Sequence, residues 1–403
     1  MSIRSDAVEL APELVALRRE LHQIPEIGLR LPLTQERVLA ALDGLPLEIT
    51  TGTDVSSVTA VLRGGRAGPA VLLRGDMDAL PVTERTGLDF TSKHEGVMHA
   101  CGHDLHTAGL VGAARLLAAR RTELPGDVVF MFQPGEEGWD GAGHMIREGV
   151  LTAAGQTVAA AYGLHVLSAD IPKHQFSGRP GPLMAASDAL YVRVVGAGAH
   201  GSRPAGGLDP IPAACEMVTA LQTMVTRRFD VFDPVVLTVG MIKGGTRKNI
   251  IPDDVSFEAT VRSFSTAARE RIMRESVRVC EDIARAHGLR AEARFEGEYP
   301  ATVNNAEHHE FVADTVRDLF GDERFTEMEF PETGSEDFSR VLNEVPGAYV
   351  FLGATEAADP ETAPTNHSPL ATFDDAVLPD GAALLAELAV RRLNQLNDGK
   401  AVA

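Results

Sequence analysis

Short, continuous apolar runs separated by helical stretches dominate most of this 403-residue chain. Four runs have no alternating polar positions, and they lie at 70–73, 128–132, 159–162 and 349–352. Continuous apolar runs of this kind are typical of strands that are buried on both faces of a mostly parallel sheet. The pattern therefore predicts an α/β domain with a mixed, largely parallel sheet. A leading helix is expected over 7–23, where leucines recur every three or four residues.

The pattern changes between residues 187 and 301, where helices alternate with strands of period-two character. The expected strands are 190–195, 235–242, 255–264 and 290–295, and the expected helices are 209–229 and 266–287. The order β-α-β-β-α-β is that of a ferredoxin-like split unit. Continuous apolar runs resume only after Asn304. The sequence therefore predicts a catalytic domain in two parts, 1–186 and 302–403, interrupted by an inserted α+β lid or dimerisation domain over 187–301.

Polar clusters directly follow three of the apolar runs. Asp76 and Asp78 come after the first run, Glu136 and Glu137 after the second, and His165 after the third. In open α/β sheets, ligands bind beyond the carboxyl ends of the strands. We therefore expect the three clusters to converge on one crevice.

The segment 99–104 brings a cysteine and histidines together before a predicted helix over 105–121. Cys101 and His103 lie two residues apart, and a thiolate and an imidazole at this spacing can both reach one metal ion. On extended backbone His99 would share their side, and Asp104 would be the N-cap of the helix. The alternative is a buried cysteine and a histidine without a ligand role, because two ligands do not make a site.

The adjacent Glu136 and Glu137 are enclosed by proline and glycine after a buried strand. Neighbouring side chains on extended backbone point in opposite directions, so the two carboxylates can have different roles. One can coordinate a metal ion while the other accepts a proton from an activated water and passes it to a leaving group. In isolation such a pair is usually a solvated surface pair, but its position after a buried strand favours the catalytic interpretation.

Two isolated histidines enlarge the candidate ligand set. His165 ends the third run, and His367 lies in a loop near the C-terminus. Together with the earlier candidates they give five possible ligands, which are Cys101, His103, Glu137, His165 and His367. Five protein ligands suit a pair of metal ions about 3.5–4 Å apart. Asp76 and Asp78 are candidates for orienting histidine ligands through the second ring nitrogen. Asp78 is the better of the two, and the alternative is an aspartate that caps a turn.

Composition limits the classes of partner. Acidic residues number 57 and basic residues 37, which gives a formal net charge of −20. This charge disfavours nucleic acid and anionic membranes as partners. Three scattered cysteines indicate a reducing compartment, and neither a signal-peptide core nor a membrane-spanning apolar stretch is found, so the cytoplasm is expected. The chain contains no G-x-S-x-G elbow, which argues against a serine hydrolase.

Nine ordered motifs between about residues 18 and 375 resemble those of a known family. They are 21–26 (LHQIPE), 75–81 (GDMDALP), 99–104 (HACGHD), 132–138 (FQPGEEG), 163–165 (GLH), 199–204 (AHGSRP), 249–253 (NIIPD), 333–338 (TGSEDF) and 367–369 (HSP). The chain resembles the aminoacylase, hippurate hydrolase and indole-acetyl-amino-acid hydrolase group of dinuclear metallo-amidohydrolases. That group is related to the glutamate carboxypeptidases and aminoacylase-1.

The resemblance implies a zinc-peptidase-like catalytic domain and an inserted lid through which a homodimer or higher homo-oligomer forms. It implies metal ligands at the five positions named above and a general base at Glu136, with Asp78 beside it. His200 would stabilise the oxyanion from the partner subunit. Asn249, Arg262 and Gly334 match substrate-binding positions, and Arg262 would hold the amino-acid carboxylate.

The expected activity is metal-dependent hydrolysis of N-acyl amino acids to a carboxylic acid and a free amino acid. The expected cofactors are two divalent ions, zinc or manganese, although nickel and cobalt suit the same donors. A dipeptidase or carboxypeptidase and an N-carbamoyl-amino-acid hydrolase are the alternatives on this scaffold. A non-catalytic metal-holding binding protein is disfavoured, because such a protein has no need of Glu136 beside the ligands.

Overall fold

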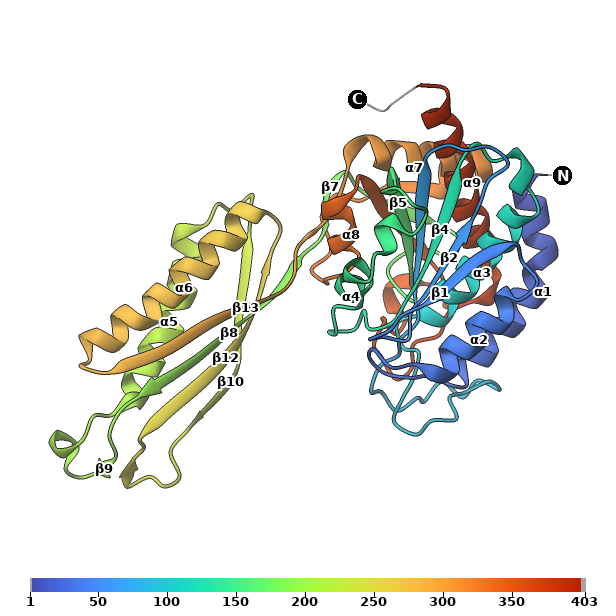
Figure 1. Cartoon of the computed structure of the whole chain (residues 1–403). Coiled ribbons are helices and arrows are strands. Elements are labelled where there is room, and N and C mark those ends of the chain that lie inside the picture. The colour runs from blue at the N-terminus through green and yellow to red at the C-terminus, as the bar shows by residue number, and fades with distance from the viewer. Residues whose placement is uncertain (1, 400–403) are drawn as a thin grey trace. The chain divides into compact units, whose positions relative to one another are not determined.

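The computed structural model describes residues 2–399, so residue 1 and residues 400–403, the outer ends of the predicted catalytic domain, lie outside the described residues. The chain forms two compact units (Figure 1). The first contains the residues up to Leu183, Val303–Phe330 and the residues from Asp337 onward, and the second contains Met184–Thr302 and Pro331–Glu336. The domain limits drawn from the sequence stay a prediction. They assign Pro331–Glu336 to the catalytic domain, whereas this segment belongs to the second compact unit.

The first unit is built around an eight-stranded mixed sheet with the strand order β1-β2-β4-β3-β5-β16-β6-β15. The strands are β1 (Leu47–Thr51), β2 (Val58–Leu62), β3 (Ala70–Asp76), β4 (Asp127–Gln133), β5 (Ala160–Leu167), β6 (Phe176–Gly178), β15 (Phe325–Glu327) and β16 (Gly347–Gly353). The central strands β4, β3, β5 and β16 pair in parallel, whereas β1, β2 and β4 pair antiparallel. The short β7 (Gly181–Met184) pairs instead with β14 (Thr302–Asn304).

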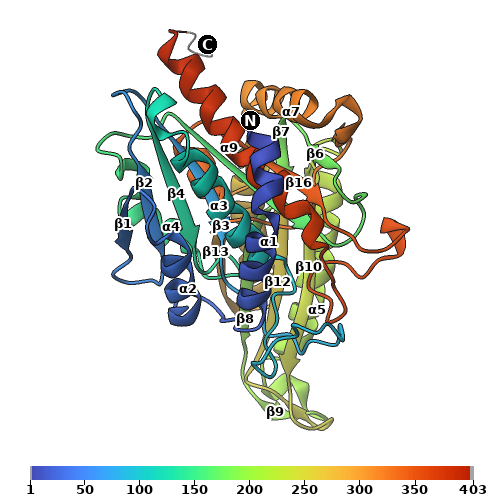
Figure 2. The same ribbon diagram turned by 90° about the vertical axis from the view of Figure 1, so that its right-hand side faces the viewer.

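Helices cover both faces of this sheet. They are α1 (Ile3–His22), α2 (Pro32–Leu42), α3 (His103–Ala118), α4 (Gly141–Arg147), α7 (Ala306–Phe320), α8 (Ser339–Glu344) and α9 (Leu378–Asn397). In Figure 2, α1, α3 and α9 pack side by side in front of the sheet, and Figure 1 shows α4 and α8 on its other side. The α1 stripe of Leu14, Leu17 and Leu21 is buried in the core of this unit. The predicted α/β class is confirmed.

The four apolar runs of the sequence are the four parallel central strands, and β3 and β16 are buried along their whole length. Such strands are covered by helices on both faces, so nearly every position is apolar. The apolar pattern of the sequence does not reveal β1, β2, β6 or β15. The strands β6 and β15 have only three residues each, which is too short for a recognisable apolar run. The strand β1 lies at the edge of the sheet and is largely exposed, so its positions need not be apolar.

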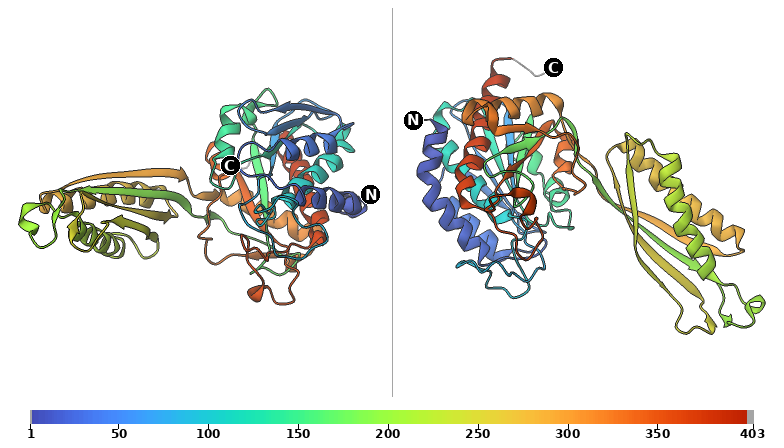
Figure 3. Two further views of the ribbon diagram at one scale, coloured as in Figure 1. Left: turned by 90° about the horizontal axis from the view of Figure 1, so that it is seen from below. Right: turned by 180° about the vertical axis from the view of Figure 1, so that it is seen from behind.

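The second unit has a four-stranded antiparallel sheet with the order β10-β12-β8-β13. Its elements are β8 (Ala186–Val195), α5 (Pro210–Arg228), β10 (Val235–Gly244), β12 (Asp254–Ser263), α6 (Thr266–Ala286) and β13 (Arg290–Tyr299). Figure 3 shows α5 and α6 on the same face of this sheet. Two short strands, β9 (Ala199–His200) and β11 (Ile250–Ile251), form a separate pair. The chain order and the sheet order are those of the ferredoxin-like split unit.

The helix α3 begins differently from the prediction. Its N-cap is Gly102, which has a φ of 81°, and Asp104 lies inside the first turn. A Cβ atom on residue 102 would lie 2.4 Å from Val166 Cγ2, so the turn requires glycine. The Asp104 carboxylate forms an ion pair with Arg18 Nε at 2.7 Å and accepts a hydrogen bond from His22 Nδ1 at 2.7 Å. The expected N-cap at Asp104 is therefore wrong, because the Asp104 carboxylate contacts two side chains of α1 and does not cap α3.

Among residues 2–399, no helix combines the length and the apolar character needed to cross a bilayer.

We expect the buried His308 to make the first unit less stable in acid. His308 Nδ1 lies 2.9 Å from Tyr162 Oη, and burial together with the Arg392 guanidinium lowers the pKa of His308 to about 3. Between that value and about 6.5, the unfolded chain binds a proton that the folded chain does not, so stability falls as the pH falls. Denaturant unfolding across this range should be less pH-dependent in His308→Gln, by at most about 1.4 kcal/mol per pH unit. An identical slope in both proteins would contradict this assignment.

Candidate metal centre

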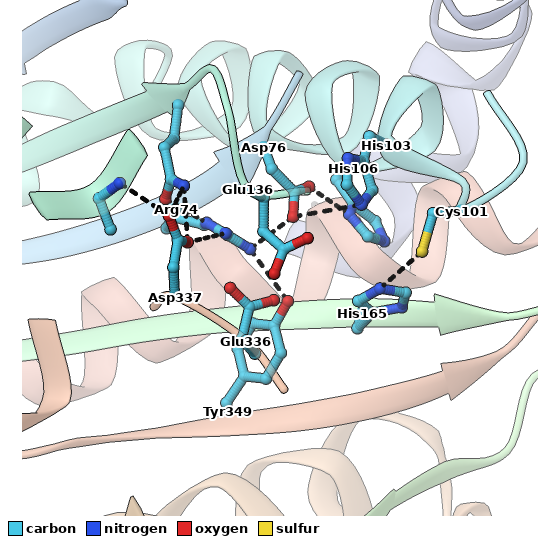
Figure 4. A network of polar contacts seen from close by, with 12 residues as sticks. Arg74, Asp76, Cys101, His103, His106, Glu136, His165, Glu336, Asp337 and Tyr349 are labelled. Atoms are coloured by element: carbon cyan, nitrogen blue, oxygen red, sulfur yellow. Dashed lines mark hydrogen bonds and ion pairs between the residues drawn. The ribbon is translucent and has the colours of Figure 1, made fainter. Parts of the chain in front are cut away.

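The predicted metal donors meet at the carboxyl ends of the central parallel strands. Cys101 precedes α3 and His103 opens it, Glu137 follows β4, and His165 lies in β5. His367 comes from the loop after β16. Figure 4 shows how Cys101, His103 and His165 approach one another from these elements. The convergence follows from the parallel topology, which brings the ends of β4, β3, β5 and β16 to one edge of the sheet.

Cys101 lies at the centre of one group of donors. Its Sγ atom is 3.4 Å from His165 Nε2 and 3.3 Å from His367 Nε2. His367 Nε2 is in turn 3.2 Å from Glu137 Oε1. A thiol, two imidazoles and a carboxylate thus present four donor atoms of the types that bind zinc and related metals.

The histidine hydrogen bonds fit a metal site. His103 Nδ1 donates to the carbonyl oxygen of Asp78 at 2.9 Å, and His165 Nδ1 donates to that of Val166 at 2.8 Å. The Nε2 atom of each ring therefore carries a lone pair, as metal-ligating histidines require. His103 Nε2 is fully buried, makes no hydrogen bond among the described residues, and lies 3.9 Å from Glu137 Oε1. This arrangement would be costly without a cation to bind.

Electrostatics at His367 also favour positive charge. The hydrogen bond with the Cys101 sulfur and the close Glu137 carboxylate raise the pKa of His367 to about 10. His367 is one of the few non-glycine residues with a positive φ, at 70°, and its amide donates to Ala100 O at 2.8 Å. Backbone strain of this kind concentrates at functional sites. The loop therefore holds His367 beside the thiol at a conformational cost.

Asp78 organises the two glutamates. Its Oδ1 accepts the Glu136 amide at 2.9 Å, and its Oδ2 accepts the Glu137 amide at 3.0 Å. Burial raises the pKa of Asp78. Its contact with the His103 ring nitrogen runs mainly through the backbone carbonyl, because the carboxylate oxygen is 3.7 Å away. One buried residue thus fixes the backbone of both carboxylates and the orientation of one imidazole.

The neighbouring carboxylates Glu136 and Glu137 occupy different surroundings. Glu137 joins the group of Cys101 and His367, whereas Glu136 lies close only to His103 and Glu137 among the predicted donors. Glu136 is 6% exposed, so its carboxylate is largely removed from solvent. Glu137 is therefore suited to coordinate a metal ion, and Glu136 to accept a proton.

His106 is a buried histidine that the sequence analysis missed. Its Nδ1 donates to Asp76 Oδ1 at 2.5 Å, and its Nε2 accepts the Val166 amide at 2.8 Å. Both ring nitrogens are occupied, so His106 connects β3 to β5 and has no lone pair for a metal. The three-residue spacing from His103 within one helix was the available signal. His99, which was expected to share a side with Cys101, belongs to no candidate metal group among residues 2–399, and its ring lies beside that of His22, with centroids 6.2 Å apart.

Arg74 is a second missed residue, buried beneath the donors. Its guanidinium pairs with Asp76 Oδ2 at 2.6 Å and Asp337 Oδ1 at 3.2 Å, and it donates to Gln133 and Tyr349 (Figure 4). A buried arginine is tolerated only when its charge is compensated in this way. The network ties β3, β4 and β16 together below the site. An arginine directly after an apolar run, within the same strand β3, was the sequence signal for it.

The other predicted residues, His200, Asn249, Arg262 and Gly334, belong to the second unit. The carbonyl oxygen of Asn249 accepts the Gly201 amide at 2.9 Å, next to His200. Arg262 donates to Thr260 Oγ1 at 2.8 Å and to Val261 O at 3.0 Å. Gly334 O accepts the Ala185 amide at 2.9 Å. His200 and Asn249 line one shallow hollow of this unit, so the structure brings these two together.

A parallel sheet whose strand ends gather thiol, imidazole and carboxylate donors beside a second carboxylate defines a metal-dependent hydrolase. Comparisons with known proteins agree. The sequence model of Peptidase family M20/M25/M40 matches residues 72–391. The chain therefore belongs to Peptidase family M20/M25/M40.

Several relatives match nearly the whole chain. Thermostable carboxypeptidase 1 of Saccharolobus solfataricus is 37% identical, with 98% of each chain covered. N-acetyl-L-cysteine deacetylase of Bacillus subtilis is 36% identical over 97% of this chain and 91% of its own length. IAA-amino acid hydrolase ILR1-like 4 of Arabidopsis thaliana is 37% identical over 95% of this chain and 86% of its own. The predicted resemblance and the class of metal-dependent amidohydrolase are confirmed.

Solved structures share the fold. A putative aminohydrolase from methicillin-resistant Staphylococcus aureus has a TM-score of 0.90 at 32% identity and covers 98% of this chain and 99% of its own. The YXEP protein of Bacillus subtilis, a dinuclear metal binding peptidase from the M20 family, has a TM-score of 0.82 at 32% identity, with coverages of 96% and 99%. Together with the clustered donors, these matches support divalent metal ions as the cofactors.

Proposed function

We propose that this protein cleaves the amide bond of N-acyl amino acids to give a carboxylic acid and a free amino acid. The observation that carries the proposal is the pair of carboxylates whose amides Asp78 holds. Glu137 lies among the metal donors and Glu136 stands beside them. The deacetylase and the amino acid hydrolase among the relatives act on substrates of this class, as their names state.

The proposed ligands are Cys101, His103, Glu137, His165 and His367. Two divalent ions held there would supply an activated water and polarise the amide carbonyl. Thiol and imidazole donors favour zinc, whereas a set rich in imidazole and carboxylate also accepts manganese, nickel or cobalt. We propose zinc or manganese as the native pair.

Glu136 is the proposed general base. Its carboxylate takes a proton from the attacking water and delivers it to the nitrogen of the leaving amine. The Glu136 amide donates a hydrogen bond to Asp78 Oδ1 at 2.9 Å, which fixes the backbone from which the Glu136 side chain extends. The carboxylate is also largely buried, so few solvent molecules compete for it. Asp78 therefore supports the proton transfer by positioning.

The second unit supplies the proposed substrate contacts. His200 would donate to the oxyanion in the active site of the partner subunit, and Asn249 and Gly334 would border the substrate. Among residues 2–399 the Arg262 guanidinium donates to a hydroxyl and a carbonyl oxygen and forms no ion pair, so its charge is available for the carboxylate of an amino acid. In a protein with a net charge of −20, a local cation of this kind is needed to hold an anionic substrate.

We further propose a homodimer formed through the second unit. Val231 and Phe232 of this unit are 79% and 94% exposed, and apolar side chains exposed to this extent favour burial against a partner. A reducing location such as the cytoplasm suits the protein, because Cys101 is unpaired and its role requires a thiolate.

A peptide bond is the second candidate target, because one relative is named a carboxypeptidase. A single panel separates the alternatives. It contains N-acetyl and N-aromatic-acyl amino acids, dipeptides and N-carbamoyl amino acids, each assayed with chelator and after zinc or manganese is restored. We expect chelator-reversible release of free amino acid from the N-acyl compounds. Cleavage of dipeptides alone would replace the proposal with the peptidase, and inactivity on the whole panel would refute both.

The same panel tests the role of Arg262. Arg262→Ala should raise KM for N-acyl amino acids by about 10- to 100-fold, because a charge-assisted pair with the substrate is lost. Analogues whose carboxylate is replaced by a carboxamide should show little difference between the two proteins. Arg278→Ala is the matched control, since Arg278 lies on the exposed face of α6 and pairs with Glu275. An unchanged KM in Arg262→Ala would remove Arg262 from the substrate site.

A further inference from the structure

His200 makes an unusual pair of contacts with the serine two residues later. The Ser202 amide lies 3.2 Å from His200 Nδ1, and Ser202 Oγ lies 2.9 Å from the same nitrogen. Both groups belong to the turn that follows β9, which Figure 1 labels in the second unit. Both contacts of the ring therefore come from one residue and meet at one atom.

These contacts determine which nitrogen of His200 carries the proton. A backbone amide can only donate, so Nδ1 must offer its lone pair to the Ser202 N–H. In neutral imidazole the proton then resides on Nε2. The Ser202 hydroxyl is consequently also a donor to Nδ1. Among the described residues Nε2 makes no hydrogen bond, so its N–H is directed to the surroundings.

The backbone around the pair is fixed independently of the side chains. His200 pairs with Ile250 across the two short strands, and His200 O accepts the Arg203 amide at 2.7 Å. The Gly201 amide donates to Asn249 O at 2.9 Å. A Cβ atom on residue 201 would lie 3.0 Å from the Asn249 carbonyl carbon, so the two loops are in close contact. The backbone hydrogen bonds of this turn therefore hold Ser202 next to the ring.

We propose that Ser202 is a positioning residue that holds His200 in its Nε2–H tautomer and fixes the direction of that N–H. This inference rests on the proposed function, in which His200 donates a hydrogen bond to the oxyanion. An oxyanion donor acts well only when its N–H is already oriented toward the position where charge develops. The opposite tautomer would present a lone pair to a developing negative charge. Ser202 prevents this by occupying Nδ1 with two donors.

The tautomer is measured directly by long-range proton–nitrogen NMR of the full-length protein labelled with nitrogen-15 histidine. The His200 resonances are assigned by their loss in His200→Gln. We expect the pattern of a neutral, Nε2-protonated ring whose Nδ1 accepts hydrogen bonds. In Ser202→Ala the backbone amide remains the single donor to Nδ1, so the Nδ1 signal should move toward that of a more weakly hydrogen-bonded nitrogen, and Ser202→Thr should restore it. An Nδ1-protonated ring in the wild-type protein, or no change in Ser202→Ala, would overturn the proposal.

Kinetics test whether this positioning affects the reaction. Ser202→Ala should lower kcat about tenfold with KM unchanged, because the His200 Nε2–H that stabilises the transition state is then less well oriented. Ser202→Thr should recover most of the rate. Thr223→Ala is the control, since its exposed hydroxyl only contacts the Thr219 carbonyl of α5 and should leave kcat unchanged. A Ser202→Ala change in KM alone would contradict the proposed role.

A double-mutant cycle separates failure of this proposal from failure of the proposed function. If Ser202 acts through His200, its replacement should have no further effect in a His200→Ala background. A tenfold loss that persists in that background would overturn the Ser202 proposal. Full activity in His200→Ala alone would instead remove His200 from the proposed mechanism, whatever the NMR result for its tautomer.

Discussion

Replacement of Glu136 by glutamine is expected to lower kcat by about two to four orders of magnitude while the metal content stays unchanged. The substitution keeps the shape of the side chain and the Asp78 contact to the backbone amide, and it removes only the proton acceptor. Proton transfer by a positioned side chain contributes an acceleration of this size. Steady-state kinetics on an N-acyl amino acid and elemental analysis of the same preparations measure both quantities.

The adjacent Glu137 provides the matched comparison. Its Oε1 atom lies 3.2 Å from His367 Nε2 and 3.9 Å from His103 Nε2, so Glu137→Gln should lower the metal content before any other property. The two neighbouring substitutions should thus separate turnover from metal binding. Near-normal kcat in Glu136→Gln, or equal loss of metal in both variants, would refute the assignment of separate roles.

Changes to the donor side chains are expected to have the second-largest effect. Cys101→Ser and His165→Ala should weaken metal binding by at least tenfold. Each substitution removes one of two neighbouring donor atoms, Cys101 Sγ and His165 Nε2, which lie 3.4 Å apart. A ligand that binds only the folded protein stabilises it by mass action. Chelation should therefore lower the melting temperature of the wild-type protein more than that of either variant.

Elemental analysis after dialysis and a chelator titration followed by thermal unfolding measure this effect. Cys215→Ser is the control, since Cys215 is exposed on α5 of the second unit and should retain the wild-type metal content. A Cys101→Ser protein with the full metal complement and an unchanged chelator response would exclude Cys101 from the ligands.

Much of the first unit could be predicted because its central strands have a local signature. A strand buried on both faces must be apolar at nearly every position, so β3, β4, β5 and β16 are visible in the sequence without knowledge of their partners. The edge strand β1 has no such requirement, and its residues after Leu47 are exposed. The strands β6 and β15 have three residues each, so they contain no apolar run long enough to be recognised.

The candidate site was predictable to the extent that residue type and order limit its chemistry. A cysteine, histidines and paired glutamates after buried strands indicate a metal hydrolase, and the ordered motifs indicate its family. Which of the buried histidines keep a ring nitrogen for a metal ion was not predictable. His103 and His106 lie on one helix turn with similar burial, yet only His103 keeps an imidazole nitrogen without a hydrogen bond.

The sequence by itself determined the fold class, the inserted split unit, the family and the types of donor atom, because these depend on local patterns and on the chemistry of single side chains. Only the tertiary structure decided what each polar group does. The Asp78 carboxylate holds amides 58 and 59 residues away, and Arg74 is compensated by Asp337 across 263 residues. A histidine acts as a ligand or as a connector according to which atoms occupy its second nitrogen. Those atoms come from strands and loops that only folding brings together.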